Sequence, residues 1–344
     1  MMDLLVGMAI SIMALLAMAT ALQVGVTNKR VISEVLDAET SANMAMGQLE
    51  SEIKSAGYGI ATAPIVGCNL KFWRGGAWVT TQLNPIEIGV GAGGNGSDTI
   101  TVAKARGDTG YASSKVLIAH AANDGTDYQS ANRYNFNVND VLLLSDGGSS
   151  CTTIGVTSLP GDGLSITWGG ANAVNSPSGA AFATTTAASM SSLGPLGVSK
   201  KVYGIDATTG SKLMRTDVMA GTAAADMGDQ VVYMKAMFGK DPTSVMKITS
   251  WDTAAPTTAA DWAKVLGIRV AIVTRSQAHE PQSVVGFGCA ATDTSCTIKM
   301  WPDETAVAVL PTTPTYTVSG DAVHYRHVLR TMVIPLRNII WNNN

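Results

Sequence analysis

Few residues in this chain have the types and spacing that an active site needs. The segment Gly89–Gly94, GVGAGG, matches the G-x-G-x-x-G fingerprint of dinucleotide-binding proteins. In those proteins the glycines let the backbone approach a pyrophosphate at the N-terminus of a helix. Here they run into NGSDTITV, whose β-branched residues predict a strand. We therefore expect a hairpin loop at this segment and no cofactor.

Metal ligation and nucleophilic catalysis have equally little support. His324 and His327 are the one close pair among four histidines, and residues three apart in a predicted strand point to opposite faces. A calcium loop needs several oxygen ligands, whereas Lys240–Thr243, KDPT, has one carboxylate beside a lysine. Asp146 in LSDGGSS has the neighbours of a tight turn, and the sequence has no G-x-S-x-G nucleophile elbow. We expect neither an enzyme nor a metal site.

The remaining candidate for chemistry is a single carboxylate. Asp3 stands at the front of an apolar run, and the 25 residues from Leu4 to Asn28 include no charged residue. As a helix, a run of this length crosses a bilayer core of roughly 30 Å. A carboxylate beside hydrocarbon is costly and marks a partner or a function. A positively charged α-amino group on a neighbouring subunit is one such partner.

The flanks of the run indicate a segment that the mature protein keeps. A secretory signal peptide carries basic residues before its apolar core and a small-residue cleavage site behind it. Here nothing basic precedes Leu4, and the basic pair Lys29 and Arg30 follows the run. An ordinary membrane anchor is the simplest alternative, but it gives no reason for Asp3.

Length and composition limit the remaining classes. The 344 residues suffice for one large or two modest domains behind the helix. Charged residues make up only 14% of the chain, and Gly, Ala, Ser and Thr are abundant, which is typical of secreted or surface β-rich proteins. A net charge of −3 gives no basic surface for nucleic acid, so no nucleic-acid partner is predicted.

The four cysteines allow three pairings. If the helix is a membrane anchor and the rest lies outside the cytoplasm, disulfides are permitted there. The short interval between Cys289 and Cys296 favours a staple across a hairpin, which leaves Cys68 to pair with Cys151. No two cysteines have the CxxC spacing of a zinc site.

The helical pattern continues beyond the apolar run. In residues 29–57 apolar side chains recur at mostly helical spacings among five acidic residues, and no proline occurs before Pro64. We expect one helix of about 55 residues, on the order of 80 Å long, that ends near Gly57 and Gly59. Its front half, residues 1–28, is apolar all round, whereas its rear half is amphipathic and needs a domain packed on one side.

After the helix the pattern changes to that of strands. Short runs of β-branched and apolar residues are separated by clusters of Gly, Asn, Asp and Pro, which predicts an antiparallel β-rich region. These runs are Asp98–Val102, Val138–Leu144, Ser165–Trp168, Val231–Phe238, Val265–Val273 and His327–Ile334.

Two β-rich parts, residues 58–170 and 196–344, are expected on either side of Ala171–Pro195. This segment has almost no bulky side chain and no charge, so it can bury little surface. We expect it to be an exposed insertion or a linker between the two parts. Pro311–Pro314 is expected to be another surface loop.

The N-terminus resembles that of a known family. Asp3–Ile10, DLLVGMAI, is similar to the start of type IV pilins, in which an acidic residue precedes an apolar helix. The resemblance implies that a prepilin peptidase cleaves after a glycine and that the new N-terminal residue is N-methylated. Asp3 takes the place of the family's glutamate and is one methylene shorter. Whether Met1 or a residue before it carries the methyl group stays open.

Three further stretches resemble the PilW family of minor type IV pilins. Glu52–Ile60, EIKSAGYGI, is similar to the block at the end of that family's helix. Trp262–Ser276, WAKVLGIRVAIVTRS, is similar to a family strand, and Arg326–Asn338, RHVLRTMVIPLRN, to a C-terminal block. The blocks occur in the family's order, and residues 103–222 are covered only loosely. The acidic loop of the family is replaced here by KDPT after Phe238–Gly239, so no ion-binding role follows for it.

The resemblance implies an α+β fold, a pilin-like lollipop with one long N-terminal helix followed by a large antiparallel β-rich region. It implies a structural subunit of a type IV pilus, located in the inner membrane before assembly and then in the extracellular pilus. The implied partners are other pilin subunits, the pilus assembly machinery and the prepilin peptidase. Asp3 would pair with the N-terminal amine of a neighbouring subunit, while Gly7 and Gly25 would allow close helix packing or local unwinding.

Several roles stay open at this point. PilW-type proteins are minor subunits at the tip or in priming, and the resemblance favours this role. The low-charge surface would also suit the principal subunit of a pilus. A type II secretion pseudopilin has a similar helix, but the C-terminal blocks argue against it. The alternative outside filaments is a membrane-anchored periplasmic binding module, which would have no use for Asp3.

Overall fold

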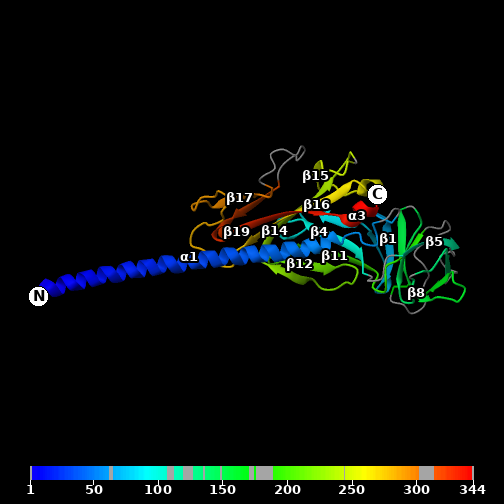
Figure 1. Ribbon diagram of the computed structural model, residues 1–344, viewed down its shortest axis with the longest axis horizontal. Coiled ribbons are helices and arrows are strands. Elements are labelled where there is room, and N and C mark those ends of the chain that lie inside the picture. Colours follow the sequence, from blue (N-terminus) through cyan, green and yellow to red (C-terminus); the bar gives the residue numbers. More distant parts are fainter. Residues whose placement is uncertain are drawn as a thin grey trace.

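The computed structural model describes most of the chain. The described residues are 2–61, 65–106, 112–118, 127–134, 136–147, 149–169, 174–175, 189–243, 245–301 and 314–342, of which 2–6, 9, 27 and 112–118 are described without their side chains. One long helix projects from a β-rich body (Figure 1). The expected α+β lollipop is thereby confirmed.

The projecting element is α1 (Met2–Lys54), a continuous helix of 53 residues. The predicted long helix is therefore confirmed, with its end three residues before the expected position. The chain turns at Gly57 and Gly59, where φ is +77° and +72°, a left-handed conformation that glycine adopts readily. The Gly57 N–H donates to the Ala103 carbonyl at 2.9 Å, which fixes the end of the helix to the β body.

The rear half of α1 packs against two antiparallel sheets, ordered β13-β12-β11-β4-β3 and β15-β14-β16-β19. Their strands are β3 (Ile86–Gly89), β4 (Thr99–Ala105), β11 (Val198–Ile205), β12 (Lys212–Asp217), β13 (Ala225–Asp229), β14 (Val231–Lys240), β15 (Ser250–Asp252), β16 (Val265–Arg275) and β19 (His327–Pro335). The helix and both sheets share one apolar core that includes Leu49, Ile100 and Ile272. The central strands β14 and β16 are apolar along nearly their whole length because both of their faces are covered.

A hairpin covers the other face of the four-stranded sheet. It consists of β17 (Ser295–Lys299) and β18 (Thr315–Ser319), and its buried side chains form a second core with those of β14 and β16. Four short helices complete this body: η1 (Gly94–Gly96), α2 (Ala259–Trp262), η2 (Gly320–His324) and α3 (Arg337–Asn342). The body thus has two cores, one on each side of the four-stranded sheet.

A six-stranded barrel lies at the end of the molecule farthest from the N-terminus (Figure 1). Its strands are β5 (Ala112–Ile118), β6 (Asp127–Ser130), β7 (Val141–Ser145), β8 (Ser150–Ser158), β9 (Ser165–Trp168) and β10 (Ser189–Ser192). They pair antiparallel in the order β8-β7-β10-β5-β6-β9, and β9 pairs back onto β8, which closes the ring. Side chains including Tyr128, Ile154 and Trp168 fill its interior.

The hairpin of β1 (Asn69–Arg74) and β2 (Ala77–Gln82) extends the barrel wall. β1 runs parallel to β8 and pairs with it over three residues. Buried residues of β1, the barrel and the five-stranded sheet form a further core, which includes Leu70, Leu143 and Val198. This core joins the barrel to the body.

The barrel is an insertion between β4 and β11. These two strands pair antiparallel, with Ala105 opposite Val198, so the chain leaves the five-stranded sheet to build the barrel and returns beside its exit. Strand pairing therefore joins segments on both sides of residues 171–195. Most of that segment lies outside the described residues, but its last part differs from the expected exposed linker. Ser189–Ser192 form β10, which pairs with β7 on one side and β5 on the other. Backbone pairing and the buried Met190 stabilise this strand, although its other residues are serines.

The glycine-rich segment is the hairpin loop that the sequence predicts. β3 ends at Gly89 and pairs antiparallel with β4, and η1 lies between them. The buried Asp98 carboxylate holds this loop, because it accepts the Gly91 N–H at 3.0 Å and the Ala236 N–H at 3.1 Å.

The prediction for His324 is wrong in part. His327 begins β19, but His324 lies in η2, where a 3₁₀ turn that starts at Gly320 replaces the expected strand. The surface loop expected at Pro311–Pro314 and His120 lie outside the described residues, except for Pro314 itself.

Candidate functional site

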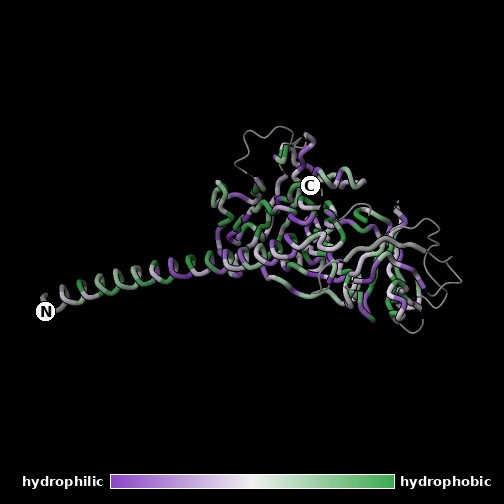
Figure 2. Tube along the Cα trace, turned by 45° about the vertical axis from the view of Figure 1, so that its right-hand side comes forward, coloured by the Kyte–Doolittle hydropathy of each residue, from purple (hydrophilic) through white to green (hydrophobic). Residues whose placement is uncertain are grey.

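The front half of α1 is an exposed apolar rod. Figure 2 shows the apolar colouring along the part of the helix that projects beyond the body. Within the described residues, α1 is the one helix whose length and composition suit a membrane span. Its large side chains that are 58–71% exposed are Met8, Ile10, Ile12, Met13, Leu15, Leu16, Met18, Leu22, Val24 and Val26.

The predicted assembly residues lie on this rod. The Asp3 side chain is outside the described part of the chain, so its pairing with a neighbour's amine stays a prediction. Gly7 and Gly25 are described, and the helix is continuous through both. A Cβ at either position would meet no described atom within 4 Å apart from the neighbouring backbone of α1 itself, so both remain open to a neighbouring helix. Their proposed roles in packing or unwinding stay predictions as well.

The rear half of α1 is seated on the sheets by a stripe of small and apolar residues. Ala38, Ala42, Ala45, Leu49 and Ile53 recur at spacings of three and four, and each is at most 2% exposed. The alanines let the helix axis come close to β16 and β19. At Ala38 the carbonyl also accepts the Thr274 hydroxyl at 3.0 Å. These contacts explain why the helix is amphipathic only behind residue 29.

A charged cluster joins the end of the helix to the five-stranded sheet. The Glu52 carboxylate accepts hydrogen bonds from Lys104 Nζ at 2.9 Å and Lys201 Nζ at 2.8 Å. Burial raises the pKa of Glu52, but the hydrogen bonds and charges of the two lysines outweigh it, so this pKa lies below its usual range. Sequence reasoning missed this cluster, because its three members come from separate elements and only the fold brings them together.

Two further contacts fix the ends of the buried part of the helix. Where α1 leaves the body, Arg30 Nη2 donates to the His279 carbonyl at 3.3 Å, and Arg30 Nε is held by Glu34 on the same helix at 2.7 Å. Beyond the other end, Asn338 Nδ2 donates to the Ala56 carbonyl at 3.0 Å. The rear half is therefore clamped along its whole length, while the front half is left free.

Both expected disulfides are present. Cys68–Cys151 links the residue before β1 to β8, and its cysteines are buried in the core that joins the barrel to the body. Cys289–Cys296 closes a seven-residue interval between the loop after β16 and the start of β17. The first staples the barrel to its neighbouring hairpin, and the second stiffens a loop beside the helix exit.

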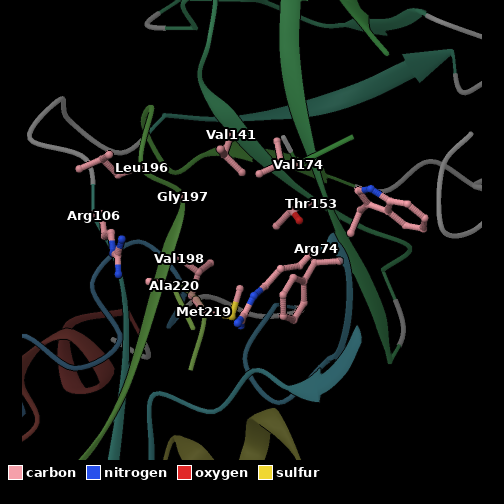
Figure 3. A pocket seen from close by; sticks show the side chains of 12 residues that line it. Arg74, Arg106, Val141, Thr153, Val174, Leu196, Gly197, Val198, Met219 and Ala220 are labelled. Carbon is pink, nitrogen blue, oxygen red and sulfur yellow. The ribbon is translucent and has the colours of Figure 1, made fainter. Parts of the chain in front are cut away.

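One pocket of the described structure has two cationic side chains on its walls. A pocket of about 240 Å³ lies where the barrel meets the five-stranded sheet, with Arg74 and Arg106 on its walls (Figure 3). Arg106 pairs with Asp217 beside the five-stranded sheet, and Arg74 of β1 donates to the Val218 carbonyl, so the Arg74 contact links the β1–β2 hairpin to that sheet. In the part of the chain that the structure describes, no group of three or more His, Cys, Asp or Glu side chains could hold a metal ion.

Comparison with known families identifies the part of the chain that matches a family model. The family model described as PilW, Type IV Pilus-assembly protein W, matches residues 202–338. Over these residues, about two fifths of the chain, the sequence is similar to the PilW family. No curated protein and no solved structure matched the chain.

The matched region, residues 202–338, includes much of the body that seats the helix. It runs from within β11 to the start of α3 and so includes β14, β16 and β19. Two of the blocks that resemble the family in sequence lie inside it. Trp262–Ser276 runs from the last residue of α2 through β16, and Arg326–Asn338 forms β19 and the start of α3. The barrel and α1 lie outside the matched residues. The chain thus combines a pilus-assembly family region with an N-terminal apolar helix.

Proposed function

We propose that this chain is a PilW-type structural subunit of a type IV pilus. The proposal rests on the division of α1 into an exposed apolar front half and a rear half that is packed against the body. An exposed apolar rod long enough to cross a bilayer is continuous with a helix that is locked into a PilW-type body. Such a subunit waits in the inner membrane with its front half in lipid, and the same surface packs against the helices of other subunits after assembly. The implied partners are those subunits, the prepilin peptidase and the assembly machinery.

We further propose a minor role, at the filament tip or in priming. The barrel lies beyond the end of α1 that is farthest from the N-terminus (Figure 1). In a filament whose subunits all point the same way, the next subunit occupies the space beyond that end. A terminal position provides room for the barrel, which favours a tip subunit over the principal subunit.

Asp3 is the proposed determinant of register. Removing a carboxylate from water into a bundle of apolar helices is costly unless an opposite charge pairs with it. Pairing with the N-terminal amine of the adjacent subunit would compensate and would set the axial position of each subunit. We expect Asp3→Ala to fold normally and to fail in assembly, whereas Asp37→Ala, a change of an exposed carboxylate on the rear half, assembles normally.

The test is quantitative mass spectrometry of sheared surface filaments from cells that express each variant. The measurement reads the amount of this chain relative to other subunits, together with its N-terminal peptide. A trace amount with a methylated N-terminus supports the minor role, and dominance of this chain would make it the principal subunit. Wild-type levels of the Asp3→Ala variant in filaments would refute the role of Asp3. Absence of the unaltered chain from filaments, with an unmethylated N-terminus, would refute the pilus proposal.

A further inference from the structure

The loop between β16 and β17, residues 276–294, lies beside the point where α1 leaves the body. Arg30 contacts this loop through the His279 carbonyl, and with Lys29 it closes the apolar run of the helix. In Figure 1 the segment between these strands lies at the end of the body nearest the N-terminus. If the front half of α1 spans a bilayer, the basic pair marks the level of the lipid headgroups. The loop then lies at the same level.

The loop carries an exposed aromatic side chain in an unfavourable backbone conformation. Gly286, Phe287 and Gly288 all have left-handed φ angles, of +85°, +54° and +82°. Phe287 is 47% exposed. Left-handed φ is a rare conformation for a bulky residue, and such strain persists where the surrounding structure enforces it. In this conformation the large apolar side chain stays nearly half exposed to solvent.

The base of this tip is rigid. Val285 is buried against the four-stranded sheet. The Cys289 N–H donates to the Gly286 carbonyl at 3.1 Å, and the disulfide joins Cys289 to Cys296 in β17. Phe287 is therefore displayed from a fixed platform, so little conformational entropy is lost when it inserts into another phase.

The sequence on either side of the tip is almost uncharged. Asp293 is the single charged residue between Pro281 and Ile298, and its carboxylate accepts the Ala290 N–H at 2.7 Å. Small residues such as Ala290 and Ala291 are exposed beside Phe287. A surface of this kind can approach a bilayer with little loss of hydration energy.

We propose that the Gly286–Gly288 tip is a second membrane contact, in which Phe287 inserts into the surface of the bilayer that anchors α1. A single helix anchor leaves the body free to tilt and to rotate about the helix axis. A second, apolar contact at headgroup level removes much of this freedom, as interfacial aromatic anchors do. The body would thereby be presented to incoming subunits in one orientation. The inference rests on the proposed function, because it requires α1 in a bilayer.

The experiment places 4-fluorophenylalanine at one position at a time in the full chain, which is reconstituted in nanodiscs of phosphatidylethanolamine and phosphatidylglycerol. The positions are 287, Leu15 in the front half of α1, and Tyr134, an 80% exposed barrel residue at the far end of the molecule. Fluorine NMR lines are recorded with a doxyl-labelled lipid and, separately, with a water-soluble gadolinium chelate. The probe at 287 differs from phenylalanine by one atom, so the fold of the loop is preserved.

We expect the lipid label to broaden the line of the probe at 287 at least about threefold more than that of the probe at 134, and the aqueous agent to broaden it less. Equal behaviour of the probes at 287 and 134 would overturn the inference, provided that the probe at 15 contacts lipid. Failure of the probe at 15 to contact lipid would instead refute the membrane-held stage of the proposed function.

A second measurement separates lipid from a protein partner. Phe287→Ser and the conservative Phe287→Trp are compared with the unaltered chain for incorporation into filaments. Trp keeps an interfacial anchor, so we expect it to match the unaltered chain, while Ser lowers incorporation. If Ser lowers incorporation although the probe at 287 stays in water, the tip contacts another subunit, and the membrane inference is wrong.

Discussion

Glu52 is the residue at which charge, rather than apolar packing, holds the helix to the sheet. Replacing it with Gln keeps the shape but leaves Lys104 and Lys201 without their shared anion. We expect Glu52→Gln to lower the free energy of unfolding by about 1–2 kcal/mol. The measurement is thermal unfolding of the full chain in detergent micelles. Glu50→Gln is the matched control, because Glu50 pairs with Lys54 on the helix surface, and a shift of less than about 0.5 kcal/mol is expected there.

The same cluster makes a prediction about acid. The pKa of Glu52 is lowered in the folded protein, so the folded state binds this proton less readily than the unfolded state. Its contribution to stability is full above the unfolded pKa, which is about 4.3, and is lost as the pH falls through the lower, folded pKa. The Gln variant should lack this part of the acid dependence. An identical acid dependence in both proteins would show that the lysines do not stabilise the carboxylate.

His327 titrates in a different pH range. Burial is the main cause that lowers its pKa to about 4, with a smaller effect of Arg275, although the hydrogen bond to the Tyr325 carbonyl at 2.9 Å acts in the opposite direction. In the unfolded chain its pKa is about 6.5, so between about pH 6.5 and 4 only the unfolded state gains the proton. Stability should therefore fall across this range as the pH is lowered, by on the order of 2–3 kcal/mol in total.

His327→Asn tests this assignment. Asparagine can donate to the Tyr325 carbonyl in place of Nδ1 but cannot take up a proton. We expect the difference in melting temperature between pH 7.5 and pH 5 to shrink in the variant. If the unaltered protein and the variant lose equal stability between these pH values, another group accounts for the effect.

At the scale of elements, the seat of α1 depends on small side chains. Ala42 is fully buried, whereas its neighbour Asn43 is exposed. Ala42→Leu would push the helix away from the sheets and should cost about 1–3 kcal/mol of stability. Asn43→Leu adds an apolar side chain on the outer face and should change stability by less than about 0.5 kcal/mol. Thermal unfolding of both variants checks the difference, and equal effects would show that the alanine stripe does not set the approach of the helix.

The elements that the sequence predicts well are those whose own side chains decide their structure. The continuous apolar and then amphipathic pattern of α1 predicts its length, and the apolar runs at Val231–Phe238 and Val265–Val273 predict β14 and β16 to within two residues at each end. β10 is missed because its serines carry no apolar alternation, and neighbouring strands supply its pairing. η2 is missed for a related reason, since one left-handed glycine, Gly320, redirects a stretch with strand-like composition.

At the scale of the molecule, the inserted barrel should be separable from the body. The Arg106 N–H donates to the Gly197 carbonyl at 2.8 Å, so β4 and β11 could be joined by a tight turn in place of the barrel. We expect a chain in which Asn-Gly replaces residues 107–196, with Cys68→Ser, to keep the PilW region folded and to enter filaments. Its melting temperature should fall, because Leu70 and other residues of the joining core become exposed. Circular dichroism and the filament measurement check this, and a folded chain that stays out of filaments would show that the barrel takes part in assembly.

The inserted barrel cannot be predicted from local patterns in the sequence. Strands that pair across an insertion are far apart in the chain, and β4 and β11 are separated by the whole barrel. The closure of the ring depends on the pairing of β9 with β8, which no local pattern specifies. For the same reason the Glu52 cluster and the contact between Arg30 and the loop after β16 emerge only in three dimensions.

The locked rear half of α1 also determines how this molecule would respond to being pulled. Tension applied at the front of the helix runs along its axis and enters the body between Glu34 and Ile53. There it meets the buried alanine stripe, the Thr274 hydrogen bond and the Glu52 cluster at the same time. These contacts therefore share the load in parallel rather than bearing it one after another. A subunit built in this way would resist extraction from a stretched fibre far better than its overall thermodynamic stability suggests.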